Sequence, residues 1–475
     1  MCENPYSGMS VAAPGKVLGR CVFVRVSLAL LCVIGGMSAW GWDLGHTIIS
    51  SRAVQLLGHE DRSLFGGELG AYTNHFSLIP DWVYKNDGTE HYVWDFCGGK
   101  TPYDSKAFVA FHILPNTADA YYHLLYAVTN AVNAAKAGRT HDFSCYAGVL
   151  SHMLEDWTCP AHSTADDNMM TILSTYLPPP EGMEHVAAKM HGKVESGDFN
   201  LDDFNYTPRC IAASAEELSF RLVLLAQNAS LSARKDIIPM VRAIYASDKR
   251  EIGRLQRLSG ERAAVILSDA LSTIGSLVRG TGAPAEGRDI SLLDCRPESC
   301  RSLAYPQSQY FGVPYWGHPQ VDWCFGGTVK VPLKLNISGR ATVVRGYFMG
   351  VGKPQTFFIP AGLFKAFKAR VGLHSELGRG SKAAFSVYMN GRKRGEVSVG
   401  GDDDAVEMSL SIPSDVTNIT LQVSKGSPDN KQYCIWGDPT LCLDTLGSDP
   451  TSHPLGSDPI SRPLGSDPTS RSRRD

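Results

Sequence analysis

Apolar residues recur at helical spacing over roughly residues 40–280, the first part of the chain. Side chains that repeat every three or four positions lie on one face of a helix, which can then pack against others. The expected helices are 46–57, 118–138, 142–154, 214–233 and 261–280. Ser214 followed by Glu217 is typical of a capping box at a helix start, and Gly138 and Gly280 are expected stop signals. The pattern predicts an all-α bundle.

The spacing changes beyond about Ser302 to short alternating runs, as expected of strands with one buried face. These runs are 328–337, 341–350, 383–390, 408–412 and 418–423. Turn segments such as "NGRKRGE" and "GGDDDA" separate them. The pattern predicts an all-β sandwich over residues 302–443.

Two other stretches lack such periodicity. Residues 281–301 are rich in Gly, Pro and charge and are expected to form a linker between the helical domain (40–280) and the sandwich. Residues 444–475 contain a nine-residue repeat, "LGSDPTSHP", "LGSDPISRP" and "LGSDPTSRS". The repeat has too few apolar residues to build a core, so a disordered tail is expected.

The N-terminal 39 residues have the pattern of a signal peptide. Basic residues precede the apolar run "VSLALLCVIGGM" (26–37), which is long enough for a signal but short for a membrane span. Ser38-Ala39 offers a cleavage point, so Trp40, or failing that Trp42, is expected to begin a secreted or periplasmic protein.

Composition and charge narrow the class of protein further. The 475 residues are 43% hydrophobic and 20% charged, with a net charge of −3, so no basic field points to a nucleic-acid partner. Export would permit disulfides, although the odd number of cysteines left after cleavage cannot all pair internally. No CxxC pattern is present. A metal would therefore be held by His and carboxylate side chains.

The stretch "SHMLEDWTCPAH" carries the strongest candidate chemistry. His152 and Asp156 are four residues apart and so project from one face of a helix. Pro160 is expected to end that helix, and the chain then turns to present His162. Imidazole and carboxylate at this spacing suit zinc. The alternative is a chance His/Asp pair at a surface helix end.

Similar residues occur elsewhere in the helical part. His191 and Glu195 are again four apart, His46 lies close to the expected mature terminus, and Asp81 and His91 fall in an aromatic-rich segment. The remaining histidines considered are expected at the surface or the edge of the core: His59, His75, His112, His123 and His141.

These elements together resemble the zinc-dependent phospholipase C family, which is related to fungal single-strand-specific zinc nucleases. The resemblance rests on the HxxxDxxxxxH and HxxxE patterns and implies three zinc ions in a helical bundle. It implies the following ligand sets: Asp81, His91, His152 and Asp156 for one zinc; His162, His191 and Glu195 for a second; His46, a bridging Asp156 and the terminal amine and carbonyl of Trp40 for the third.

Such a site is suited to phosphodiester hydrolysis, because zinc neutralises the substrate's charge and activates water. Asp156 would bridge two zinc ions and Asp81 would orient the attacking water or take its proton. Glu195 favours a phospholipase C that cleaves a phospholipid headgroup at a membrane surface. A zinc-dependent single-strand nuclease remains the alternative among enzymes. An alternative outside the enzymes is a noncatalytic glycan- or surface-binding protein. No G-x-S-x-G or HExxH pattern supports a serine hydrolase or zincin.

The β part is similar to the NPCBM carbohydrate-binding module. The similarity rests on "FKAFKARVGLHSELGRGSKAAFSVYMNGRKRGEVS", "ITLQVSKG" and "CIWGDPTL". It implies a jelly-roll sandwich that attaches the chain to a glycan. The alternative is a β domain that only packs on the helical one.

Overall fold

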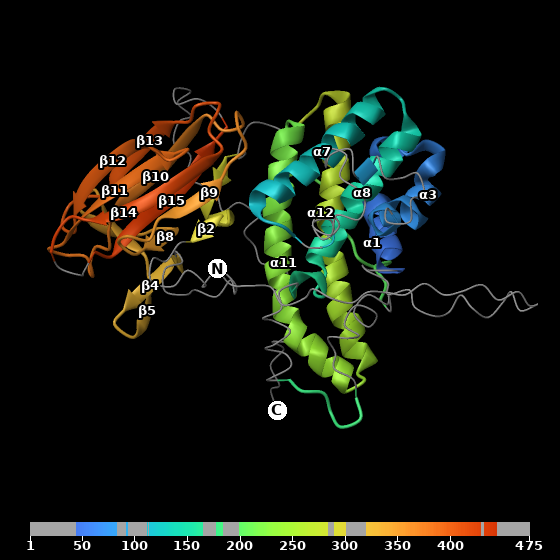
Figure 1. Cartoon of the computed structure of the whole chain (residues 1–475), viewed down its shortest axis with the longest axis horizontal. Coiled ribbons are helices and arrows are strands. Elements are labelled where there is room, and N and C mark those ends of the chain that lie inside the picture. Colours follow the sequence, from blue (N-terminus) through green and yellow to red (C-terminus); the bar gives the residue numbers. More distant parts are fainter. Residues whose placement is uncertain are drawn as a thin grey trace, which may run out of the picture. The chain divides into compact units, whose positions relative to one another are not determined.

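A computed structural model describes residues 44–82, 92–93, 112, 114–164, 177–183, 199–283, 289–300, 320–428 and 432–443. Helices occupy the first part of this chain and antiparallel strands the last part (Figure 1). The predicted fold class, an all-α domain followed by an all-β sandwich, is confirmed. The segments expected to be a signal peptide (1–39) and a disordered repeat tail (444–475) lie outside the described residues.

Among its described residues, the helical part contains four long helices and several shorter ones. The α-helices are α1 (Leu44–Leu56), α2 (His59–Ser63), α3 (Leu69–Asn74), α4 (Ile79–Trp82), α7 (Thr117–Lys136), α8 (Thr140–Thr158), α11 (Ala215–Tyr245) and α12 (Lys249–Arg279). Short 3₁₀ helices are η1 (Gly66–Glu68), η2 (Phe76–Leu78), η5 (His162–Thr164) and η7 (Leu292–Asp294). No described helix has the length and apolar character needed to cross a membrane.

The helix ends follow the local sequence signals. The Ser214 side chain accepts a hydrogen bond from the backbone N–H of Glu217 and so caps α11. Gly280 ends α12 in the left-handed conformation, with φ of 74°. Helix α8 stops at Thr158, and Cys159 is extended, as expected for the residue before a proline.

Helix α8 lies at the centre of the helical part and packs against α1, α7, α11 and α12. Fifteen of its residues are buried, including Phe143, Leu150 and Trp157. At Gly148, α8 lies against η2: a Cβ there would be 2.4 Å from the carbonyl atoms of Phe76. Because no side chain intervenes, η2 lies directly on α8, and this contact fixes the backbone beside His152.

The described strands of the β part form two larger antiparallel sheets and two separate hairpins (Figure 1). One has the order β13-β10-β15-β8-β3, with β1 also paired to β15, and the other has the order β12-β11-β14-β9-β2. Their strands are β1 (Ile290–Ser291), β2 (Ser299–Cys300), β3 (Gln320–Val321), β8 (Gly346–Met349), β9 (Gln355–Phe358), β10 (Ala366–Leu373), β11 (Lys382–Met389), β12 (Arg392–Gly400), β13 (Val406–Ser411), β14 (Asn418–Lys425) and β15 (Cys434–Cys442). Separate hairpins are β4 (Trp323–Gly326) with β5 (Val329–Pro332) and β6 (Lys334–Ile337) with β7 (Arg340–Val343).

Alternate residues of the two sheets form the core of the sandwich. Trp436 of β15 is fully buried, and its ring lies 5.4 Å from that of Phe385 in β11, centroid to centroid. Val371 and Leu421 are likewise buried. Aromatic and β-branched residues on inward positions thus hold the sheets together.

The expected linker 281–301 is wrong in part. Within it, Ile290 pairs with Leu441 in one sheet, and Ser299 pairs with Thr356 in the other. Each of these two-residue strands pairs its backbone with a neighbouring strand. They are too short to show an alternating pattern in the sequence. The sandwich therefore begins before residue 302.

Most cysteines whose side chains the structure describes are buried: Cys145, Cys159, Cys295, Cys324, Cys434 and Cys442, with Cys210 half-buried. No disulfide joins any two of these seven cysteines.

Candidate metal centre

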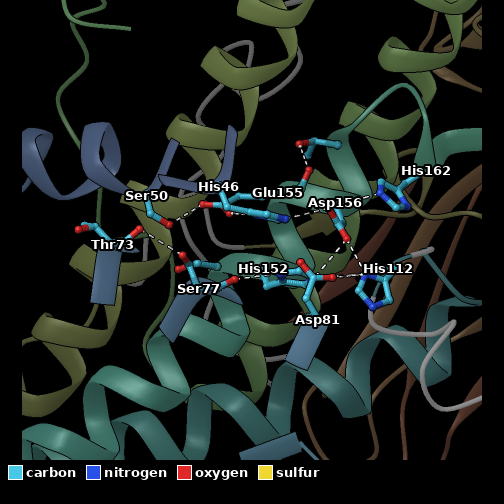
Figure 2. Close-up of polar contacts among 12 residues, drawn as sticks. His46, Ser50, Thr73, Ser77, Asp81, His112, His152, Glu155, Asp156 and His162 are labelled. Atoms are coloured by element: carbon cyan, nitrogen blue, oxygen red, sulfur yellow. Dashed lines mark hydrogen bonds and ion pairs between the residues drawn. The ribbon is translucent and has the colours of Figure 1, made fainter. Parts of the chain in front are cut away.

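Five buried or half-buried polar residues from separate segments converge around Asp156 (Figure 2). Helix α8 presents His152 and Asp156 on one face, one turn apart. His46 comes from α1, Asp81 from α4 and His162 from the start of η5. His112 lies five residues before the start of α7 in the sequence. Asp156, His152 and His46 have no exposed side-chain surface, whereas the Asp81 side chain is 18% exposed.

The two carboxylate oxygens of Asp156 face different imidazoles. Oδ2 lies 2.9 Å from His112 Nδ1 and 3.2 Å from His152 Nε2. Oδ1 lies 3.4 Å from His46 Nε2 and 3.6 Å from His162 Nε2. Each carboxylate oxygen of Asp156 thus faces a different pair of imidazole nitrogens.

Two groups of donor atoms are close enough to hold a metal ion. One consists of His46, His152 and Asp156, and the other of Asp81, His112 and His152, with the ligand atoms in each group within 4.8 Å of one another. Asp81 Oδ1 lies 3.8 Å from His112 Nδ1 and 3.9 Å from His152 Nε2. Nitrogen and carboxylate donors without sulfur match the ligand preferences of zinc.

The hydrogen bonds of His152 support a cation at this place. His152 Nδ1 lies 2.8 Å from the backbone carbonyl of Ser77, which can only accept, so Nδ1 carries the hydrogen. In the neutral ring, Nε2 then directs a lone pair toward Asp156 Oδ2 and toward His112 Nδ1, 3.2 Å away. A proton occupies such a position when no metal is bound, and a metal cation can replace it there, so the donor set fits a metal.

Burial and charge set the protonation of these groups. Burial lowers the pKa of His112 to about 4, although the hydrogen bond with Asp156 opposes the shift. Burial, with the neighbouring His152, also lowers the pKa of His46. Neutral imidazoles retain the lone pair that a metal ligand needs.

In the central pair, His152 and Asp156, the neighbouring charges outweigh the effect of burial on the pKa values. Burial alone would lower the pKa of His152, but the carboxylates of Asp156 and Asp81 outweigh it and raise the value to about 9. Burial opposes ionisation of Asp156, yet His162 and His152 hold its pKa well below the ordinary value. Without a metal, the centre therefore keeps an ionised Asp156 beside a protonated His152.

Glu155, the residue before Asp156, contacts two residues of α1. Glu155 Oε2 lies 2.5 Å from His46 Nδ1, and the Ser50 hydroxyl donates to Glu155 Oε1 over 2.7 Å (Figure 2). His46 and Ser50 are four residues apart on one face of α1. This contact joins α1 to α8 behind the donor atoms.

The structure brings together five of the nine metal ligands expected from the sequence. These are His46, Asp81, His152, Asp156 and His162. The other four, Trp40, His91, His191 and Glu195, lie outside the described residues.

The prediction that His112 lies at the surface or the edge of the core is wrong. It is 2% exposed and faces Asp81, Asp156 and His152. No spacing to a second acid or histidine marks it in the sequence, so sequence analysis alone had no local signal for it. Neither donor group includes any other histidine of that set: His59, His75, His123 and His141.

The β part matches a family model, and several solved structures are similar to the chain. Residues 317–442 match the NPCBM/NEW2 domain model. No curated protein matches the chain significantly by sequence. The helical metal-site candidate is thus joined to an NPCBM-type sandwich.

Three similar structures illustrate both parts. The Clostridium perfringens alpha-toxin from avian strain SWCP is 11% identical, with 84% of this chain and 98% of that chain covered and a TM-score of 0.30. The CBM51 domain from C. perfringens GH95, in complex with methyl-galactose, is 17% identical, with 32% and 99% covered and a TM-score of 0.27. The C. perfringens ZmpB M60 catalytic domain with two CBM51 domains is 15% identical, with 33% of this chain covered and a TM-score of 0.28.

The chain spans only 15% of the length of that ZmpB structure. At identities of 11 to 17% and TM-scores of 0.30 or less, these similarities transfer no activity to this chain.

Proposed function

We propose that this chain is a zinc-dependent phosphodiester hydrolase of the phospholipase C type, which releases a phosphorylated headgroup from a phospholipid. The observation that carries the proposal is Asp156, whose two oxygens face separate sets of imidazole nitrogens. A carboxylate shared in this way is suited to hold two cations close together, as phosphoester-cleaving metal centres require.

When bound, zinc would neutralise the phosphodiester and lower the pKa of a coordinated water. The residues around it have distinct tasks. Asp156 and His152, without exposed surface, hold the centre in place. Asp81 is 18% exposed, so its carboxylate can reach a water on the solvent side, orient it and accept its proton.

The proposed ligand set departs from the sequence prediction at one position. His112 takes the place expected for His91, because its Nδ1 lies within 3.8 Å of Asp81 and 2.9 Å of Asp156. His162, His191 and Glu195 would hold a further zinc, and the terminal amine of Trp40 would complete the set of His46. These assignments imply three zinc ions and an exported, processed protein.

The C-terminal sandwich is proposed to attach the enzyme to a glycan. Its support is the family match over residues 317–442. A phospholipid at a membrane surface as substrate and a glycan as anchor are compatible, because both occur on cell surfaces.

The proposal can be tested by incubating purified protein with phosphatidylcholine or with single-stranded DNA. Each assay is run with and without a strong chelator. We expect zinc by elemental analysis and release of phosphocholine that the chelator abolishes. Release of 5′-nucleotides alone would favour the nuclease alternative. Glycan-array binding without hydrolysis of either substrate would favour a noncatalytic surface-binding protein.

A further inference from the structure

Glu155 is a buried carboxylate that the proposed reaction does not use. It follows His152 by three residues and precedes Asp156, yet it belongs to neither group of donor atoms. Its side chain has no exposed surface. A buried carboxylate is costly to keep unless its partners compensate for the lost water, so its contacts carry information.

Those contacts place the His46 ring between two carboxylates. Nδ1 lies 2.5 Å from Glu155 Oε2, while Nε2 on the opposite edge lies 3.4 Å from Asp156 Oδ1 (Figure 2). The ring also stacks on His152, with centroids 4.3 Å apart and planes at 18°. The ring is therefore held at both edges and on one face.

The Ser50 hydroxyl donates to Glu155 Oε1, and Oε2 faces His46 Nδ1. Burial raises the pKa of Glu155 well above its ordinary value, so without a metal the proton between the two side chains can lie on Oε2. When the Nε2 lone pair binds a cation, the ring hydrogen must lie on Nδ1, and the ionised Oε2 accepts it. That lone pair faces Asp156 and the donor group of His46, His152 and Asp156.

We infer that Glu155 is a positioning residue of the metal centre, which fixes the tautomer and orientation of His46 so that Nε2 faces the ion. The inference rests on the metal centre of the proposed function. A carboxylate behind a ligating histidine also makes the imidazole a stronger donor, and loss of such a partner typically weakens metal binding. Ser50 in turn orients Glu155.

A purely structural role makes a different prediction. Glu155 also ties α1 to α8, and a simple tie would affect only the stability of the fold. Asp269 of α12 provides a matched control, because it too is a buried carboxylate and belongs to neither donor group. The Tyr206 hydroxyl and the Arg209 backbone N–H both donate to it.

The experiment compares the full chain with Glu155→Leu, Glu155→Gln and Asp269→Asn variants. Zinc affinity is measured by competition with a chromophoric chelator, and the His46 Nδ1–H hydrogen bond is read from ring ¹⁵N shifts of zinc-loaded protein. We expect Glu155→Leu to lose about 10- to 100-fold in affinity for one zinc and to shift the His46 Nδ1 signal, because Nδ1–H loses its acceptor. Glu155→Gln should lose less, because its amide oxygen still accepts from Nδ1. Asp269→Asn should unfold more easily with unchanged zinc affinity.

A folded Glu155→Leu protein with wild-type zinc affinity and a wild-type His46 Nδ1 signal would overturn the inference. If that variant does not fold, Ser50→Ala decides: a shifted His46 Nδ1 signal with weaker zinc binding supports the inference, and no change overturns it. Wild-type protein that binds no zinc would instead overturn the proposed function. The two failures are therefore distinguishable.

Discussion

His112 Nδ1 lies 2.9 Å from Asp156 Oδ2, although 44 residues separate the two along the chain. The contact places an imidazole at the side of Asp156 that also faces His152 and Asp81. It is the part of the candidate centre that local sequence patterns did not reveal, and it leads to the first prediction.

Replacing His112 with Ala should remove one donor from the group of Asp81, His112 and His152. We expect lower zinc content and at least about 100-fold slower phosphodiester hydrolysis, because a metal site that lacks one ligand positions its ion and water poorly. Elemental analysis and turnover of a soluble phosphodiester provide the measurement. His141→Ala is the control, since the His141 side chain is 59% exposed; equal losses in both variants would contradict the role of His112.

Gly148→Ala should disturb the site without touching a donor atom. The new Cβ would meet the Phe76 carbonyl at 2.4 Å and push η2 away from α8. Ser77, the next residue, would then hold His152 Nδ1 less well. We expect a loss of about 1–3 kcal/mol in the free energy of unfolding, together with weaker zinc binding.

Urea unfolding and chelator competition on the Gly148→Ala protein check both parts. Gly70→Ala in α3 is a suitable control, because a Cβ at Gly70 meets no atom within 4 Å. Wild-type zinc affinity in a destabilised Gly148→Ala protein would show that η2 does not position His152.

His112 should contribute stability to the zinc-free protein that is lost as the pH drops from about 6.5 to 4. Its pKa is lowered to about 4 in the fold, so at this residue the unfolded chain binds more protons over this range. For His112 alone the loss amounts to about 3 kcal/mol. His152 acts in the opposite direction: its pKa of about 9 gives stability that is lost as the pH rises from about 6.5 to 9.

Urea unfolding of zinc-free protein across this range tests the effect. Between about pH 6.5 and 4, the free energy of unfolding should fall less steeply in His112→Asn, because Asn cannot take up a proton. An equally steep fall in that variant would show that His112 is not buried as a neutral imidazole.

The mature terminus gives a prediction outside the described residues. A backbone nitrogen ligates zinc only as a free, unprotonated amine, so cleavage after Ala39 is expected to create a ligand at Trp40. Intact mass of secreted protein should place the first residue at Trp40, or failing that at Trp42. Protein with an uncleaved extension should hold fewer zinc ions and turn over more slowly; full zinc content in that form would exclude the terminus as a ligand.

The sequence was informative wherever one element carries its own pattern. His152 and Asp156 were predicted to share a helix face because both lie within a single periodic segment, and α8 has that form. The helix end at Gly280 likewise follows from a local rule. Regular spacing and terminal residues are therefore readable without tertiary information.

Features that depend on distant partners were missed for a physical reason. Glu155 acquires its role from His46, 109 residues earlier, and nothing within α8 indicates that contact. The strand at Ile290 exists because β15 offers it a pairing edge. Such features are fixed by chain folding over long separations and have no period to detect.

The shared carboxylate of Asp156 has a thermodynamic consequence. When one side chain contributes to two ion sites, occupation of either site alters the geometry and charge that the other ion meets. Linkage requires the effect to be reciprocal: the first ion changes the affinity for the second by the same factor as the second changes it for the first. Zinc uptake by this centre would therefore be a coupled process, whose titration curve reports an interaction free energy between ions rather than a sum of independent affinities.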